Sequence, residues 1–423
     1  MTIRGDHINP IRKRILFSSL YFSEGAPIGY LWLALPTRLR DSGLPVEQIT
    51  WLTAVLVLPW TFKFLWAPLV DAFHGTRWTL RHWIVVSQIL MGATLLPLLW
   101  LDPISQFSGM AACLILHAFV AATQDVSIDA WCIATTDIGE RGRLNGWMQA
   151  GMLLGRACMG GGALVLSTYI GDRSVVLVLI ALIWCSMLMV IVHARSPAPQ
   201  PPPLGGSQSP IDASMGEGEP RRSIRWRPAR STWFALAFAA TGAAVFKSLE
   251  VVYGPFLIDR GIKKQTIGWF SMGPMIGSMI IGSLLGGWLA DRWGRRHCVA
   301  GSLLFIVLAV AGLALTDLSG QATPASLLVW LAAAALGIGM FTSSSYAMYM
   351  DLAEPATAAT QFSAFMGATN GCESWSSYAA GQLIKTRGYP SALLWMCAAS
   401  IVSLPILWGL RRRHESEGTR REE

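Results

Sequence analysis

Charged residues are scarce in this sequence of 423 residues. Asp, Glu, Lys and Arg together make up 14% of the chain, whereas hydrophobic residues make up 53%. Soluble proteins carry about 25% charged residues, so this composition excludes an ordinary soluble domain with a single buried core. The balance of residue types instead indicates a protein that lies largely in lipid.

Signatures of disulfide, metal and nucleotide chemistry are also missing. The seven cysteines form no C-x-x-C pair, so neither a disulfide framework nor a zinc site is predicted. The chain has no G-x-x-x-x-G-K-[ST] loop, which argues against ATP hydrolysis, and no H-E-x-x-H motif. We expect no cofactor and no metal ligands. His117, with no second His or Cys nearby in sequence, is expected to be a packed or pore-lining side chain.

Long apolar runs account for the composition. Runs of roughly 18 to 25 residues, the length that crosses a bilayer as a helix, recur along the chain, and the mean hydropathy is +0.45. We therefore predict an all-α polytopic membrane protein. Its twelve transmembrane helices are expected at about residues 15–36, 48–70, 83–101, 109–134, 144–170, 174–193, 231–257, 266–290, 298–316, 325–350, 358–383 and 391–410.

The distribution of basic residues predicts the orientation of these helices. Arg12, Lys13 and Arg14 precede the first apolar run, which ends without a small-residue cleavage site, so an uncleaved first span is expected. With twelve spans both termini lie on one side, and most of the 33 lysines and arginines fall on that side. The positive-inside rule then places both termini in the cytoplasm. This topology explains the net charge of +8 without a nucleic-acid partner.

The chain divides into two similar halves. Residues 196–230 are rich in Pro, Gly, Ser and charge, which predicts a flexible cytoplasmic linker. One pattern occurs twice without a gap, as Leu39-x-Asp41-x-Gly43-Leu44-x4-Ile49-x-Trp51 and as Leu257-x-Asp259-x-Gly261-Ile262-x4-Ile267-x-Trp269. We therefore predict a six-helix half at 1–195, the linker at 196–230, a second six-helix half at 231–410 and a cytoplasmic tail at 411–423.

A motif in the second half matches a known family. The segment GWLADRWGRR, residues 287–296, fits the pattern G-x-x-x-D-R-x-G-R-R and resembles the loop between the second and third helices of each half in major facilitator transporters. The resemblance implies the major facilitator fold, with substrate held near the midplane between the halves. It also implies gating roles for Gly287, Asp291, Arg292, Gly294, Arg295 and Arg296.

Each kind of residue in this gating motif has its own expected role. Gly287 is expected to allow close helix approach, and Asp291 to cap a helix or to pair across the interface between the halves. The arginines are expected to face the cytoplasm and anionic headgroups. The alternative is a basic loop that sets topology without any gating role. The first half keeps only a degenerate copy of the motif, which ends at Asp71.

Three further segments resemble one group of this superfamily. KFLWAPLVD (63–71), QDVSIDAW (124–131) and ATAATQFSAFMG (356–367) are similar to segments of the AmpG and acetyl-CoA transporter group. AmpG-type permeases carry two additional helices that are not predicted here. The first helix, with YFSEGAPIGYLWLALPTRLRDSG, is more similar to the siderophore-permease branch of RhtX and FptX type. That resemblance implies import of a siderophore or its metal complex across the inner membrane, and the alternative substrate is a muropeptide.

Two aspartates are expected to form the working site of the fourth helix. An ionised side chain at the bilayer centre costs on the order of 2.5 to 3.5 kcal/mol, so such residues face a wet cavity or one another. Asp125 and Asp129 share one helix face, with Gln124 beside Asp125. Two neighbouring carboxylates in a low dielectric do not both ionise easily, so we expect Asp125 to couple protons or contact substrate. Asp129 has an alternative role as a structural partner of loop arginines such as Arg141.

Helices one and seven carry a second set of intramembrane charges. Lys247 and Glu250 lie three residues apart on one face, with Tyr253 one turn further on. They either neutralise each other or border the cavity opposite Glu24 of helix one. Glu24 precedes Pro27, and broken helices at corresponding positions in the two halves indicate a binding site.

Two basic residues have open assignments. Lys63 is expected either to extend its flexible stem to an interface or to meet Asp71. Arg156 is an anion-binding candidate, and a local ion pair with an aspartate of the fourth helix is the alternative. The glycines around it, Gly151, Gly155, Gly160, Gly161 and Gly162, are expected to serve close helix packing.

Polar side chains on helices ten and eleven complete the predicted site. Tyr346 follows a run of hydroxyl residues, and Asn370 and Glu373 lie on the eleventh helix. Facing a cavity, such groups suit an aromatic, oxygen-rich ligand such as a catecholate siderophore. Hydrogen bonds between helices are the alternative.

A secondary transporter explains these features together. We predict a non-enzymatic, proton-coupled importer of the inner membrane that works by alternating access. A polytopic membrane enzyme is the alternative from another class, but the sequence shows no nucleophile with a base and no His/Asp cluster at an interface. A receptor is favoured only if binding occurs without translocation.

Overall fold

The computed structural model describes residues 10–67, 69–70, 78–135, 138–193, 230–352 and 358–409. Within these ranges every regular element is a helix. The predicted gating residue Asp71, residues 196–229 of the predicted linker and the predicted tail 411–423 lie outside the described residues.

The first half contains six membrane-length segments. The first is one continuous helix with a π-helical turn, and the others are long helices or helix pairs. Their elements are α1 (Pro10–Gly29), η1 (Tyr30–Ala34) and α2 (Leu35–Asp41); α3 (Val46–Phe62) and η2 (Lys63–Leu65); α5 (Leu80–Leu95) and η3 (Leu96–Leu99); α6 (Phe107–Thr135); α7 (Ile138–Met159) and α8 (Gly161–Ile170); and α9 (Asp172–His193).

The second half repeats this organisation. Its elements are α10 (Arg230–Thr241) and α11 (Ala244–Asp259); α12 (Lys264–Phe270), η5 (Ser271–Met275) and α13 (Ile276–Trp293); α14 (Arg295–Leu318); α15 (Pro324–Leu352); and α16 (Ala358–Trp408). The helix α16 is two segments joined at Gly388, whose φ of 78° and ψ of 169° are not helical.

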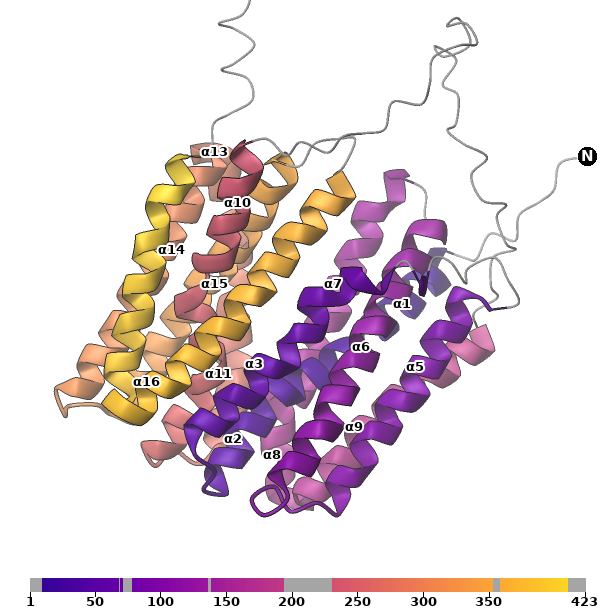
Figure 1. The fold of residues 1–423 in the computed structure, drawn as a ribbon, viewed down its shortest axis with the longest axis horizontal. Coiled ribbons are helices and arrows are strands. Elements are labelled where there is room, and N and C mark those ends of the chain that lie inside the picture. The colour runs from indigo at the N-terminus through magenta and orange to yellow at the C-terminus, as the bar shows by residue number, and fades with distance from the viewer. Residues whose placement is uncertain are drawn as a thin grey trace, which may run out of the picture.

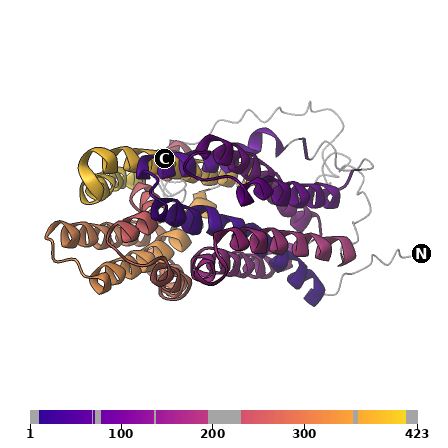
Figure 2. The ribbon, with the colours of Figure 1, turned by 90° about the horizontal axis from the view of Figure 1, so that it is seen from below.

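The prediction of twelve spans is confirmed by these helices. Ten helices of the described residues are long and apolar enough to cross a membrane. The continuous helix Pro10–Asp41 is absent from that set because it is more polar, and Gln361–Trp408 counts once although Gly388 divides it. In Figure 1 the indigo-to-magenta helices of the first half lie beside the salmon-to-yellow helices of the second. Figure 2 shows the same two groups after a quarter turn.

The repeated sequence pattern is a helix stop. Gly43 and Gly261 occupy the left-handed region, with φ of 92° and 76°, which favours glycine because it has no Cβ. The next amide donates back to the helix in both halves, from Leu44 to the carbonyl of Leu39 at 2.9 Å and from Ile262 to that of Leu257 at 3.0 Å. This six-to-one bond and the following apolar residue are the Schellman motif. The pattern therefore ends the first helix of each half at equivalent positions.

The two halves pack together along α3 and α16, where Ser374 donates to the carbonyl of Ala54 and a Cβ on Gly367 would lie 3.2 Å from the carbonyl oxygen of Thr61. We call the end that carries the turns 42–45, 100–106, 171, 260–263, 319–323 and 388 the distal end, and the other the terminal end. The larger hydrophobic cluster contains residues of both halves. The smaller cluster, which includes Phe17, Ile128 and Trp131, contains residues of the first half alone. In the described part of the chain, apolar packing thus joins the halves through the larger cluster.

Close backbone contacts connect particular helices. A Cβ on Gly155 of α7 would lie 2.4 Å from the carbonyl oxygen of Phe22 in α1, and one on Gly151 would lie 2.1 Å from that of Ser18. A Cβ on Gly161 of α8 would lie 2.5 Å from the carbonyl oxygen of Gly268 in α12, across the two halves. The predicted role of these glycines in close helix packing is confirmed at Gly151, Gly155 and Gly161.

Candidate functional site

Three carboxylates of the first half meet in its interior. Asp125 of α6 lies 2.6 Å from Nζ of Lys63 at the end of α3. Asp129, one turn later, accepts a hydrogen bond of 2.5 Å from the hydroxyl of Tyr21 in α1. Glu24 of α1 is 3% exposed and lies close enough to Asp125, Asp129 and Lys63 to interact electrostatically with all three. We call these five residues the acidic cluster.

The acidic cluster holds more acid than base. Three carboxylates face the single ammonium of Lys63, and a low dielectric disfavours ionising all three. Oε2 of Glu24 and both amide atoms of Gln124 are buried without a hydrogen-bond partner. The acidic cluster therefore places three acids, one base and unpaired polar atoms in the interior of the first half.

Two residues of this cluster have partners that the sequence did not predict. Lys63, expected at an interface or near Asp71, pairs with Asp125, which is 62 positions away in sequence. Asp129, for which a loop arginine such as Arg141 was the alternative partner, accepts a hydrogen bond from Tyr21. Asp71 and the side chain of Arg141 lie outside the described residues, so pairing with either stays a prediction. The predicted association of Gln124 and Asp125 with Asp129 holds, since all three lie on adjoining turns of α6 and Asp125 is 7% exposed.

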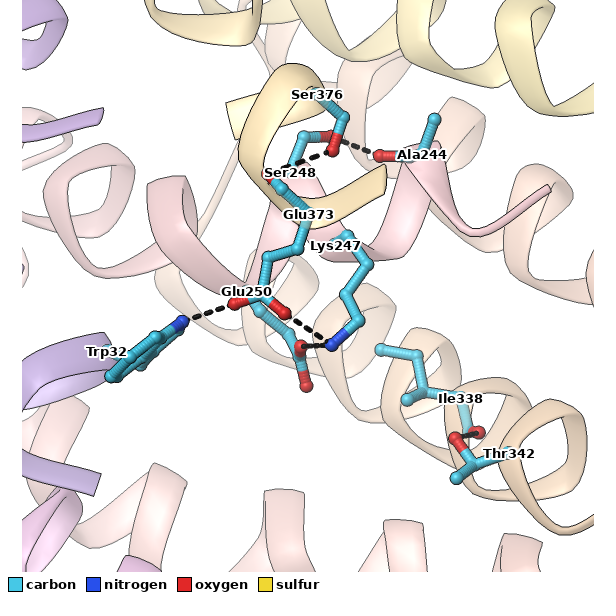
Figure 3. A network of polar contacts seen from close by, with 9 residues as sticks. All are labelled: Trp32, Ala244, Lys247, Ser248, Glu250, Ile338, Thr342, Glu373 and Ser376. Atoms are coloured by element: carbon cyan, nitrogen blue, oxygen red, sulfur yellow. Dashed lines mark hydrogen bonds and ion pairs between the residues drawn. The ribbon is translucent and has the colours of Figure 1, made fainter. Parts of the chain in front are cut away.

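The second half contains a corresponding charge network. Nζ of Lys247 in α11 lies 2.6 Å from Glu373 of α16 and 3.8 Å from Glu250 of its own helix. The indole of Trp32, from η1 in the first half, donates a hydrogen bond to the other oxygen of Glu373. Figure 3 shows Glu373 between the indole and the ammonium, with the carboxylate of Glu250 beside Glu373 on the same side of Lys247. We call these four residues the charge network.

The geometry revises the predicted pairing on helix seven. Spacing along the sequence pointed to Lys247 and Glu250 as a self-sufficient pair, but Glu373 is the closer partner by more than an ångström. Helix seven is interrupted at Gly242 and Ala243, between α10 and α11 and close to Lys247. Helix one, by contrast, continues through Pro27, and its irregular turn is η1, which carries Trp32.

A small cavity lies between the halves beside this network. It encloses about 60 Å³ and is lined by Arg156 of α7, Glu250 and Tyr253 of α11, Ser271 of η5 and Trp32. The hydroxyls of Tyr253 and Ser271 are hydrogen-bonded at 3.1 Å, and Tyr253 is buried. The predicted ion pair of Arg156 with an aspartate of α6 is not found. Arg156 forms no ion pair with any carboxylate of the described residues.

Other predicted site residues form no hydrogen bond or ion pair with the described residues of these clusters. Tyr346 is 39% exposed and meets Phe362 edge to face at 6.3 Å, while Asn370 is half-buried. The hydroxyls that precede Tyr346 donate to carbonyls of their own helix, as Thr342 does to Ile338 at 2.8 Å (Figure 3). His117 is fully buried, with Nδ1 3.1 Å from the carbonyl oxygen of Met91. Across the described ranges, no three His, Cys, Asp or Glu side chains could together hold a metal ion.

The gating motif forms contacts within the second half. Gly294 has a φ of 86° at the turn between α13 and α14, and Arg292 lies over the ring of Trp288. Arg295 lies 3.5 Å from Asp291, which is 75% exposed, and forms a closer ion pair with Asp351 of α15. Among the residues that the structure describes, Asp291 forms no ion pair with the first half. Arg296 is half-buried at the start of α14.

The expected close approach at Gly287 is wrong. A Cβ built there would meet open space, whereas one on Gly282 would lie 1.9 Å from the carbonyl oxygen of Leu336 in α15. Gly286 is similarly close to Met340. The packing glycines of α13 are therefore Gly286 and Gly282, which lie one and five residues before the motif begins.

Ion pairs between the halves lie at the distal end. Arg40 of α2 is 2.6 Å from Asp259 of α11, and Lys385 of α16 is 3.1 Å from Glu47 of α3. Lys264 of α12 lies 3.5 Å from Asp41. Every ion pair that joins the two halves among the described residues is at this end, so the distal end is closed in this conformation.

Sequence reasoning missed three participants. Tyr21 lies three residues before Glu24 on the same helix, and this spacing is a signal from which its role was predictable. Trp32 and Ser271 lie in π-helical turns. Trp32 contacts Glu373 of the other half, and Ser271 contacts Tyr253 of another helix. Both contacts arise from tertiary packing alone. No local pattern identifies them.

Comparison with known proteins identifies the family of this chain and solved structures of the same fold. The model of the Major Facilitator Superfamily matches residues 17–371 and 246–423, so the chain belongs to this superfamily. Solved structures of the same fold include the D-xylose–proton symporter, with a TM-score of 0.72 at 10% identity over 94% of this chain and 97% of that one. A bacterial homologue of the lysosomal transporter Spinster, in an inward-facing and unoccupied conformation, also has a TM-score of 0.72, at 13% identity over 94% and 95%.

Relatives in sequence show which members of the superfamily this chain is similar to. The anhydromuropeptide permease of Escherichia coli K12 is 27% identical over 424 residues, which cover 94% of this chain and 79% of that protein. A protein named putative transporter AmpG 4 from Rickettsia conorii is 23% identical over 92% of this chain and 94% of its own length. The chain is thus a major facilitator transporter homologous to AmpG permeases. The resemblance to the siderophore-permease branch finds no counterpart among these relatives.

Proposed function

We propose that this protein is a proton-coupled secondary transporter of the bacterial inner membrane that imports a muropeptide into the cytoplasm. The observation that carries the proposal is the similarity to the anhydromuropeptide permease, which extends over 94% of the chain. A transporter also accounts for intramembrane charges that a non-enzymatic structural protein does not need.

The acidic cluster supports proton coupling. A proton held among Glu24, Asp125 and Asp129 reduces the charge that faces Lys63, and its release restores a strong ion pair. Because the cluster spans α1, α3 and α6, a change in its protonation alters contacts between three helices at once. That coupling is the physical link between proton binding and helix movement.

Alternating access is proposed because the ion pairs between the two halves, among the described residues, all lie at the distal end. We propose that residues 1–195 and 231–410 move as two bodies joined by the linker 196–230, with both termini and the tail 411–423 cytoplasmic. The positive-inside distribution then makes the distal end extracytoplasmic. Its closure by ion pairs corresponds to an inward-facing state, the state in which the Spinster homologue was solved.

A muropeptide is favoured over a siderophore as the substrate. The relatives described above include an anhydromuropeptide permease, whereas the siderophore expectation depended on the number of predicted helices and on the sequence of the first helix. The hydroxyls of α15 that were expected to contact a catecholate instead bond to their own helix. A siderophore or its metal complex is therefore the second candidate.

An uptake experiment distinguishes the two substrates. Cells that lack their own permeases would receive this chain, and entry of a labelled anhydromuropeptide and of a labelled ferric siderophore would be measured in parallel. We expect uptake of the anhydromuropeptide, abolished by a protonophore. Uptake of the siderophore alone would contradict the proposed substrate, and uptake of neither would contradict the proposed transport of both classes.

A further inference from the structure

Arg156 is a charged residue placed deep in the membrane-spanning region. It lies fourteen residues before the distal end of its segment at Ile170, about 21 Å at 1.5 Å per residue. The hydrocarbon core is about 30 Å thick, so this depth lies inside the core and past its middle. A guanidinium keeps its charge at any physiological pH and is costly in such a position.

The fold fixes this arginine without neutralising it. Its backbone is pressed against α1, where a Cβ on Gly29 would lie 2.5 Å from the carbonyl oxygen of Arg156. The helix is interrupted directly afterwards, at Gly160. Within the described ranges its side chain reaches no carboxylate at ion-pair distance, whereas Lys63 and Lys247 each have one at 2.6 Å.

The cavity beside Arg156 has the size and lining of an anion site. A volume of about 60 Å³ is several times the roughly 10 to 15 Å³ that one water molecule needs, so the cavity admits a carboxylate group. On the wall from the second half, the hydroxyl of Tyr253 is hydrogen-bonded to that of Ser271, which donates to the carbonyl of Ile267, so the guanidinium of Arg156 is the donor free for an anion. Glu250 is the acid on the wall, and Lys247 at 3.8 Å partly offsets its charge.

We propose that Arg156 binds a carboxylate group of the transported substrate. This inference rests on the proposed transport function and adds the chemical class of group that the site recognises. A guanidinium forms two parallel hydrogen bonds with a carboxylate, which gives orientation as well as affinity. Since residues of both halves line the cavity, a carboxylate bound to Arg156 of α7 lies beside α11 and η5 of the other half.

Binding to purified protein in lipid nanodiscs tests this assignment. The probes are an anhydromuropeptide with free peptide carboxylates, the same molecule with its carboxylates amidated, and a carboxylate-type ferric siderophore. We expect the wild-type protein to bind the acid form about 10- to 100-fold more tightly than the amide form, the range for one charge-assisted contact. Arg156→Gln is expected to abolish this preference, and Arg156→Lys to retain about a tenth of the affinity.

A surface arginine supplies the matched control. Arg387→Gln removes an exposed guanidinium that lies over Trp395, and it should leave the acid preference intact. The comparison of acid and amide in the wild-type protein needs no variant, so a misfolded Arg156→Gln does not obscure the result.

The outcomes separate this inference from the proposed substrate. Binding of the siderophore but not the muropeptide, with dependence on Arg156, would support the carboxylate site and contradict muropeptide transport. Equal binding of acid and amide by the wild-type protein would overturn the site while leaving transport intact. Unchanged acid preference in Arg156→Gln, or no binding of any carboxylate probe, would likewise overturn it.

Discussion

Arg40 and Asp259 form a 2.6 Å ion pair that joins the two halves of the protein at the distal end. Asp259 and Asp41 occupy the same position of the repeated helix stop, and Asp41 is itself 3.5 Å from Lys264 of the other half. The repeat therefore places an acid from each half against a base from the other. These reciprocal contacts stabilise the closure of one end.

Removing the Arg40 pair should open the distal end. Arg40→Gln is expected to shift the population by a few fold towards the open state, because a partly exposed ion pair contributes about 1 kcal/mol. Spin labels at Ser42 and Thr386, both exposed, would report this as a longer distance component in pulsed electron resonance.

Arg260→Gln is the matched control for that measurement. Arg260 also lies at the distal end and pairs with Asp317, but both belong to the second half. The distance distribution should therefore stay as in the unmodified protein. An equal opening in both variants would contradict a specific role for the inter-half pair.

Loss of Asp125 should separate stability from proton coupling. Asp125→Asn leaves Lys63 without its partner, and we expect a loss of about 2 kcal/mol, less than for a fully buried pair because the lysine side chain is 30% exposed. The double variant Asp125→Asn, Lys63→Gln should recover most of the thermal stability, yet transport should remain insensitive to pH. Recovery of pH-dependent transport in the double variant would argue against the acidic cluster as the coupling site.

The two acids around Lys247 should differ in their effect on stability. Glu373→Gln breaks the 2.6 Å pair and is expected to cost about 3 kcal/mol, as for a buried pair that loses one partner. Glu250→Gln removes a contact of 3.8 Å and should cost less than 1 kcal/mol while Glu373 still neutralises the lysine. Thermal unfolding in one detergent compares them, and the reverse order would contradict the assigned pairing.

Two glycines of one helix should respond oppositely to alanine. Gly282→Ala forces α13 away from the backbone of α15 and is expected to lower the unfolding temperature by several degrees. Gly287→Ala meets open space and should be neutral or slightly stabilising, because alanine favours helix by up to about 1 kcal/mol. Equal destabilisation by both changes would restore Gly287 as the packing position.

The sequence predicts the helices far better than their contacts. Apolar run length marked the spans, since crossing a bilayer requires a minimum of about 20 apolar residues whatever the tertiary structure. Helical spacing also placed Asp125 and Asp129 on one face. These properties are local, and so they are readable from a single chain.

Local sequence properties did not predict which residues of different helices pair with each other. Lys63 meets Asp125, and Lys247 prefers Glu373 over the nearer acid in sequence, because helix packing decides which faces meet. The same limit explains Gly287, where a family motif was assigned a packing role that belongs to Gly282 and Gly286. Spacing identifies the residues that need a partner and leaves the partner itself to the fold.

The most direct test of a proton-coupled muropeptide importer is uptake by purified protein in sealed proteoliposomes. Labelled anhydromuropeptide would be supplied outside, with an inward proton gradient imposed or omitted, for the wild-type protein and for Asp125→Asn. We predict accumulation above the external concentration only with the gradient and only in the wild-type protein. Accumulation that persists without a gradient, or that is unchanged in Asp125→Asn, would contradict the account.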